Sequence, residues 1–107
     1  MEDKDRKIQE MHIIEQNLHN LLLQKQAFQI ELTETSSALE EVESSTDEVF
    51  KIIGQLMIKT DKSKMKEELL NKKKMLELRL KTIEKQENSL TKQLNDIREG
   101  LIKSMRK

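Results

Sequence analysis

One short segment with strand-like character constrains the fold of this chain more than any other feature. Residues 49–58 read Val-Phe-Lys-Ile-Ile-Gly-Gln-Leu-Met-Ile, so β-branched, aromatic and apolar side chains flank a Gly-Gln pair. Gly at the first central position of a two-residue loop suits a type II′ turn, which predicts a β-hairpin. In that register Ile53 faces Leu56 and Ile52 faces Met57.

Both faces of this predicted hairpin are largely apolar. Alternation along the strands leaves Lys51 as the one charged side chain on one face and Lys59 as the one on the other. A hairpin that is solvated on one side normally shows a polar face there, and a two-stranded hairpin is marginally stable alone. We therefore expect it to pair with copies or relatives of itself through Val49, Phe50, Ile52, Ile53, Leu56, Met57 and Ile58.

A long helix is predicted before the hairpin. Apolar residues recur at alternating spacings of three and four over residues 11–42, the pattern of a and d positions in a coiled coil, with Lys25 as a polar exception. The short polar side chains of residues 44–47, Ser-Ser-Thr-Asp, compete for the hydrogen bonds of the backbone and stop the helix. The pattern predicts a helix over about residues 5–43.

A second heptad pattern follows the hairpin. Asp61 is placed to cap the start of this helix, and leucine-rich a and d positions recur over residues 69–101. The two apolar seams are nearly equal in length and joined by a short connector, which favours an antiparallel helical hairpin. Lys25 and Glu87 would occupy seam positions at nearly the same height, so we expect their side chains to interact.

The composition agrees with this architecture. Charged residues make up 37% of the chain and hydrophobic residues 35%, with no Pro and two Gly, which suits exposed helices with a narrow apolar seam rather than a globular core. The predicted fold class is mainly α, a long antiparallel coiled-coil hairpin in a single domain over residues 1–107. Its predicted elements are a helix over about 5–43, a β-hairpin over 48–60 that joins an oligomeric β-barrel, and a helix over 61–105.

Charge balance and the lack of cysteine exclude several functions. The 20 basic residues balance the 20 acidic ones, so no overall field favours nucleic acid or an anionic membrane. Without Cys there is no disulfide, thiolate nucleophile or zinc–thiolate site. No glycine-rich phosphate loop or concave core is visible, so we predict neither enzyme activity nor a cofactor. No run reaches membrane-spanning length, and we expect a cytoplasmic protein.

Two smaller motifs have simple explanations. His12 and His19 are seven residues apart and share a helix face, but zinc ligation within a helix prefers a spacing near four and needs further ligands. No metal site is predicted there. Residues 72–74, Lys-Lys-Lys, lie in a helix rich in Glu and lack interleaved aromatic residues that stack on bases, which indicates a solvated helix face.

Residues 47–97 resemble the β-class subunit of prefoldin. The resemblance rests on residues 48–54, Glu-Val-Phe-Lys-Ile-Ile-Gly, and on residues 76–87, Leu-Glu-Leu-Arg-Leu-Lys-Thr-Ile-Glu-Lys-Gln-Glu. The family pattern is an aromatic and β-branched strand, a Gly turn, a second strand and a Leu-rich helix. Phe50 stands where the family often has Tyr. The compact length resembles archaeal members of the family.

The resemblance implies a heterohexamer of two α-class and four β-class subunits. Their hairpins would form a shared β-barrel platform from which the coiled coils project. It further implies an ATP-independent holdase that captures unfolded client proteins and passes them to a group II chaperonin. Clients would be held at the coiled-coil tips by Ile8, Met11, Ile13, Ile14, Leu101, Ile102 and Met105.

The residues by themselves leave two alternatives open. The apolar residues of the tips are either ordinary seam residues at frayed helix ends or a contact surface. Ile13 and Ile102 lie off the main stripe, and Met is common at surfaces that accept many partners, which favours a contact surface. The whole chain could also be a structural coiled-coil tether, but a tether needs only helices, whereas a hairpin with two apolar faces needs a barrel.

Overall fold

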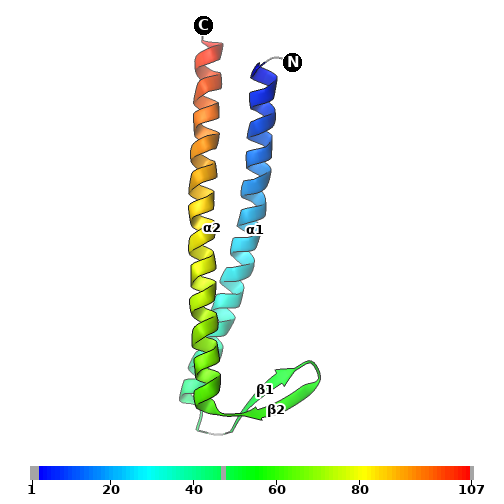
Figure 1. Cartoon of the computed structure of the whole chain (residues 1–107), viewed down its shortest axis with the longest axis vertical. Helices are drawn as coiled ribbons and strands as arrows, with labels where there is room; N and C mark the ends of the chain where they lie inside the picture. Colours follow the sequence, from blue (N-terminus) through cyan, green and yellow to red (C-terminus); the bar gives the residue numbers. More distant parts are fainter. Residues whose placement is uncertain (1–2, 47, 107) are drawn as a thin grey trace. The chain divides into compact units, whose positions relative to one another are not determined.

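The computed structural model describes residues 3–46 and 48–106. Two long helices, α1 (Asp3–Ser44) and α2 (Lys62–Met105), are separated in the chain by strands β1 (Val49–Ile53) and β2 (Leu56–Thr60) (Figure 1). The strands pair into one two-stranded antiparallel sheet. The predicted fold class, mainly α with a β-hairpin at the helix connection, is confirmed.

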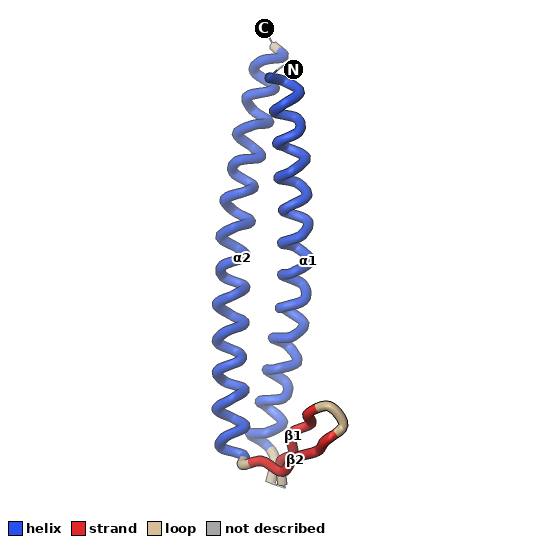
Figure 2. The backbone as a smooth tube through the Cα atoms, turned by 45° about the vertical axis from the view of Figure 1, so that its right-hand side comes forward, coloured by secondary structure: helices blue, strands red, loops and turns tan. Residues whose placement is uncertain are grey.

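The chain divides into two compact units, and each contains part of both helices. Met1–Ala27 and Leu80–Lys107 form one, here named the terminal unit, and residues 28–79 form the other, here named the hairpin unit. Within the terminal unit, the two helical stretches run antiparallel and side by side (Figure 2). Within the hairpin unit, α1 leads into the β-hairpin and α2 leads out of it.

Buried side chains in both units fall on the predicted seams. Ile14, Ile83 and Leu94 are buried in the terminal unit, and Leu76 is almost completely buried in the hairpin unit. Thr35 is the polar member of the seam, and its Oγ1 donates a hydrogen bond to the Glu31 carbonyl at 2.8 Å. Because its hydroxyl is paired within the helix, burying Thr35 leaves no unsatisfied polar atom.

The end of α1 is stabilised by a residue of α2. The last turn of α1 contains no basic residue that would favour the negative end of the helix dipole. Lys62 supplies that charge from the first position of α2, because its Nζ donates to the carbonyls of Glu43 at 3.2 Å and Ser45 at 2.7 Å. One carbonyl of the last turn of α1 and the carbonyl of the residue that follows the helix are thereby satisfied. Asp47, which we expected to help stop this helix, lies outside the described residues.

The start of α2 carries the cap that the sequence predicts. Asp61 Oδ1 accepts a hydrogen bond from the Ser63 amide at 3.2 Å, and the Asp61 carbonyl accepts one from the Met65 amide at 2.9 Å. The side chain therefore satisfies one of the amides that the first turn of a helix leaves unpaired.

The β-hairpin has the predicted register and turn. Ile53 pairs with Leu56 and Ile52 pairs with Met57, as expected from the sequence. Gly54 has a φ of 61°, and no non-glycine residue in the described part of the chain has a positive φ. A positive φ at the first central residue alone distinguishes a type II′ turn from a type I′ turn.

Candidate functional site

The β-hairpin exposes nearly all of its apolar surface. Val49 is half-buried, whereas the rest of the predicted interface residues are exposed, and Ile52 reaches 70%. The exposed members come from both faces of the hairpin, as the register requires. They are Phe50, Ile52, Ile53, Leu56, Met57 and Ile58.

Both lysines of the hairpin form ion pairs. Lys51 Nζ lies 3.0 Å from Glu68 Oε2 of α2, and Lys59 Nζ lies 2.9 Å from Glu48 Oε1 beside β1. These pairs are solvent-exposed, so each contributes at most about 1 kcal/mol to the stability of the fold. The hairpin is thus tied to the helix by surface charge rather than by a core, and its apolar faces remain available.

A second group of predicted site residues lies at the ends of the helices, in the terminal unit. Ile8 and Ile13 of α1 are exposed, with Ile13 at 59%, and Met11 is half-buried. Ile14 is different, because only 8% of its surface is accessible. The seam therefore encloses the Ile14 side chain, and the client contact expected of this residue stays a prediction. Ile14 occupies a d position, and the seam buries it.

The end of α2 contributes three further residues to the terminal unit. Ile102 and Met105 are exposed, and Leu101 is half-buried. Exposed apolar side chains therefore lie at the start of α1 and at the end of α2. Single exposed apolar residues are common on protein surfaces.

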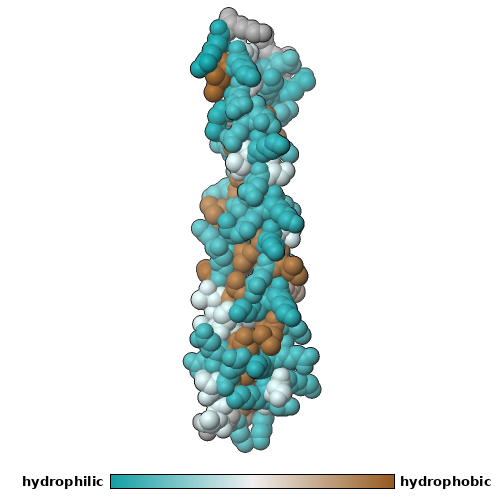
Figure 3. All heavy atoms as spheres, turned by 90° about the vertical axis from the view of Figure 1, so that its left-hand side faces the viewer, coloured by the Kyte–Doolittle hydropathy of each residue, from teal (hydrophilic) through white to brown (hydrophobic). Residues whose placement is uncertain are grey.

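Sequence reasoning missed a third group of exposed apolar residues, away from the helix ends. On the face drawn in Figure 3, apolar side chains form separate patches among polar ones. Leu22 and Leu23 are exposed in the terminal unit, and Ile30, Leu70 and Met75 are exposed in the hairpin unit. Their positions outside the a and d pattern were the available signal, because seam residues are buried.

In residues 3–46 and 48–106 no three side chains of His, Cys, Asp or Glu lie close enough to hold a metal ion together. Within the same ranges, neither helix contains a stretch that is both long and apolar enough to cross a membrane.

The sequence profile of the prefoldin subunit family matches residues 5–107 of the chain. The chain belongs to the prefoldin family. It is 39% identical over 94 residues to the prefoldin subunit beta of Thermococcus onnurineus. The aligned region covers 86% of this chain and 81% of that relative. The chain is 42% identical over 85 residues to the prefoldin subunit beta of Thermococcus kodakarensis, which covers 78% and 73% of the two chains.

A solved prefoldin structure has the same fold. The crystal structure of the prefoldin beta subunit from Thermococcus strain KS-1 matches with a TM-score of 0.93 and 33% sequence identity, over 100% of this chain and 96% of that one. The resemblance to β-class prefoldin subunits is thereby confirmed. Prefoldin is a chaperone family, so membership favours chaperone activity over enzyme activity.

Proposed function

We propose that this chain is a subunit of a hexameric, ATP-independent holdase, built from two α-class and four β-class prefoldin subunits. The holdase captures non-native proteins at the ends of its coiled coils and delivers them to a group II chaperonin. The observation that carries the proposal is the β-hairpin, which exposes apolar residues on both faces in a chain whose helices already bury their own seams.

A shared β-barrel accounts for the exposed hairpin. Burying a large aliphatic or aromatic side chain is worth roughly 1.5–3 kcal/mol, and the hairpin exposes six such side chains. Both of its strands are also edge strands, because within the described residues the sheet consists of β1 and β2 alone. Closure into a barrel with neighbouring hairpins pairs these edges and covers the apolar faces at the same time.

Client contact at the helix ends accounts for the second exposed group. Non-native proteins expose apolar segments of varied sequence, which suit contacts that are apolar and adaptable. Met is flexible and polarizable, and it recurs at surfaces that accept many partners. Each contact is weak, but several subunits act on one client, so affinity rises through multivalency. The predicted contact residues are Ile8, Met11, Ile13, Ile14, Leu101, Ile102 and Met105, of which only Ile14 is buried.

Assembly and client protection test this function together. The full chain is mixed with an α-class prefoldin subunit, and the mass of the complex is measured by sedimentation. Guanidine-unfolded citrate synthase is then diluted into the complex without ATP, and light scattering reports aggregation. We expect a hexamer that suppresses the scattering. Refolding on later addition of a group II chaperonin and ATP tests delivery. A hexamer that leaves aggregation unchanged would instead identify the chain as a structural tether.

A further inference from the structure

Gly100 lies near the end of α2, at a position where packing does not require a glycine. Its φ is not positive, so it is part of the helix, which continues to Met105. A Cβ at Gly100 would meet one atom within 4 Å, Lys7 Nζ at 3.9 Å, which is an ordinary van der Waals contact. Alanine would therefore fit. Gly is less favourable than Ala inside a helix by about fivefold in an equilibrium constant, so the chain forgoes helix stability at this position.

Glycine also favours the end of a helix. Without a Cβ it readily adopts the left-handed conformation at the first position after a helix. Such a stop is often accompanied by an apolar contact between the residue after the glycine and the third or fourth helical residue before the helix end. Leu101 follows Gly100, but Asp96 and Asn95 occupy those two positions. The stop is therefore available but not fixed, and α2 continues past it.

Lys7 is placed to stabilise a shorter form of α2. Its ammonium lies beside Gly100, where the first turns of α1 run next to the last turns of α2 (Figure 2). A cation acts on the helix dipole only within the last turn, which in the full-length helix lies beyond Gly100 and contains Lys103. If α2 ends at Glu99 instead, the unpaired carbonyls lie directly before Gly100. Lys7 is then the cation of the last turn, as Lys62 is for α1.

The segment beyond Gly100 loses little contact when it leaves the helix. Ile102 and Met105 are already exposed, at 44% and 69%, and Leu101 is half-buried. The remaining positions of residues 101–106 are polar and exposed. Helix geometry holds the consecutive pair Leu101 and Ile102 about 100° apart, and release from the helix removes that constraint.

We propose that Gly100 and Lys7 form a conformational switch at the end of α2. In one state the helix continues to Met105, and in the other it stops at Glu99 and releases residues 101–106. The released state takes up non-native polypeptide, because its apolar side chains can adapt to segments of varied sequence. This role of the released segment rests on the holdase function proposed above, whereas the switch itself does not.

The variant Gly100→Ala tests the switch. Each variant is assembled with the α-class subunit, and amide hydrogen exchange of residues 101–106 is measured by mass spectrometry without client, with correction for intrinsic exchange rates. We expect Gly100→Ala to slow this exchange about fivefold, because alanine favours the continuous helix. Asn71→Ala, a matched control, raises helix propensity at an exposed position of α2 in the hairpin unit and should leave this exchange unchanged. Unchanged exchange in Gly100→Ala would disprove the switch.

The variant Lys7→Met tests the role of the ammonium. We expect it to slow the exchange of residues 101–106, because the released state loses a favourable charge at its helix end. Arg6→Met removes the same charge from the adjacent position, which has no atom within 4 Å of a Cβ at Gly100, and should leave the exchange unchanged. Faster exchange in Lys7→Met would show that Lys7 stabilises the full-length helix, and would overturn its assignment.

Client binding tests what the released segment does. The affinity of each complex is measured for fluorescent, reduced and carboxymethylated α-lactalbumin, a permanently unfolded probe. Apparent affinity falls with the population of the binding-competent state, so Gly100→Ala should bind at least about fivefold more weakly, although its helix is more stable and keeps every apolar side chain. Slower exchange with unchanged affinity would refute capture by the released segment and leave the holdase function intact. Failure of the unmodified complex to bind the probe would refute both.

Discussion

Lys25 Nζ of α1 lies 3.2 Å from Glu87 Oε1 of α2, and both side chains are largely enclosed by the seam of the terminal unit. The heptad pattern predicted this pair, and the structure confirms it. A partly buried ion pair loses much of its Coulomb energy to desolvation, so apolar packing of similar volume is often more stable. The ion pair instead fixes the register of α1 against α2, because an alternative alignment of the helices would bury one charge without the other.

The exchange of both residues tests this balance. We expect Lys25→Leu/Glu87→Leu to raise stability by about 1 kcal/mol or more, which corresponds to an increase in Tm of roughly 5 °C. Either single substitution should lower the Tm, because it leaves one partly buried charge without its partner. Thermal circular dichroism of the four proteins forms a double-mutant cycle. A double variant that melts below both single variants would contradict this reasoning.

The hairpin is predicted to determine assembly. Ile53 and Leu56 are paired across the turn, and Ile53→Asp/Leu56→Asp would bury two unpaired carboxylates in a barrel, at several kcal/mol each. We expect the hexamer to be lost in sedimentation while most helical circular dichroism remains. Gln55→Asp adds charge at the turn rather than on a face and should still assemble. An intact hexamer from the double variant would disprove the barrel.

Removal of the end of α2 is predicted to lower client protection while leaving the fold and the hexamer intact. Truncation after Ile97 removes Leu101, Ile102 and Met105, in final turns that contribute little to the fold because helix ends fray. The hexamer should form, while suppression of citrate synthase aggregation should fall several-fold, since every subunit of this type loses part of a multivalent contact. Unimpaired protection would show that clients bind elsewhere.

A milder variant controls for loss of helix in that truncation. Ile102→Gln/Met105→Gln keeps the full length of α2 and removes only the exposed apolar groups. It should reduce client protection in the same direction. Met75→Gln, exposed on α2 in the hairpin unit, should leave protection unchanged.

Lys62 is predicted to stabilise the junction between the helices. Its Nζ donates to the Glu43 and Ser45 carbonyls, so Lys62→Met should lower the free energy of unfolding by about 0.5–1 kcal/mol. Lys64→Met is the matched control, because Lys64 is exposed in the same turn and makes no ion pair within the described residues. Urea unfolding followed by circular dichroism compares the two. An equal loss of unfolding free energy in both variants would show that the missing positive charge, and not the two hydrogen bonds of Lys62, causes the effect.

The sequence predicts those features of the fold that depend on local pattern. The pairing of Ile53 with Leu56 follows from the turn, and the pairing of Lys25 with Glu87 follows from heptad phase. Ile14 differs from its exposed neighbour Ile13, because its d position in the heptad places it in the seam, where it is buried. The heptad phase was the deciding information.

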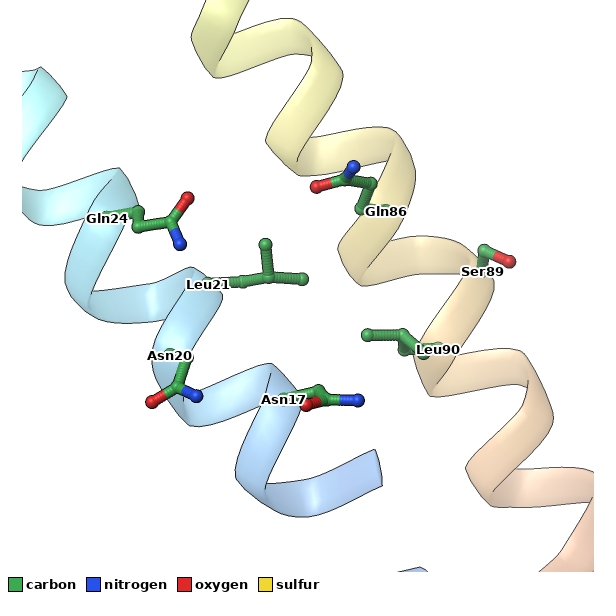
Figure 4. A pocket seen from close by; sticks show the side chains of 7 residues that line it. All are labelled: Asn17, Asn20, Leu21, Gln24, Gln86, Ser89 and Leu90. Carbon is green, nitrogen blue, oxygen red and sulfur yellow. The ribbon is translucent and has the colours of Figure 1, made fainter. Parts of the chain in front are cut away.

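Other features depend on how separate segments approach in space. The bonds from Lys62 to the end of α1 require two helix ends to meet at a particular distance, which no local pattern encodes. A groove of about 480 Å³ between Leu21 of α1 and Leu90 of α2 likewise depends on amide residues of two helices that lie far apart in the chain (Figure 4). In the sequence these amides are typical of an ordinary solvated helix surface.

The bonds of Lys62 also affect the order in which the chain folds. Lys62 and Ser45 are separated by 17 residues, whereas Lys25 and Glu87 are separated by 62. Closing the shorter loop costs less entropy, and contacts between residues near in sequence form faster. We expect the two helices to pair first in the hairpin unit and last in the terminal unit. The terminal unit should then also open most readily. The segment proposed to contact unfolded proteins would then be the part of this chain that itself spends the most time partly unfolded.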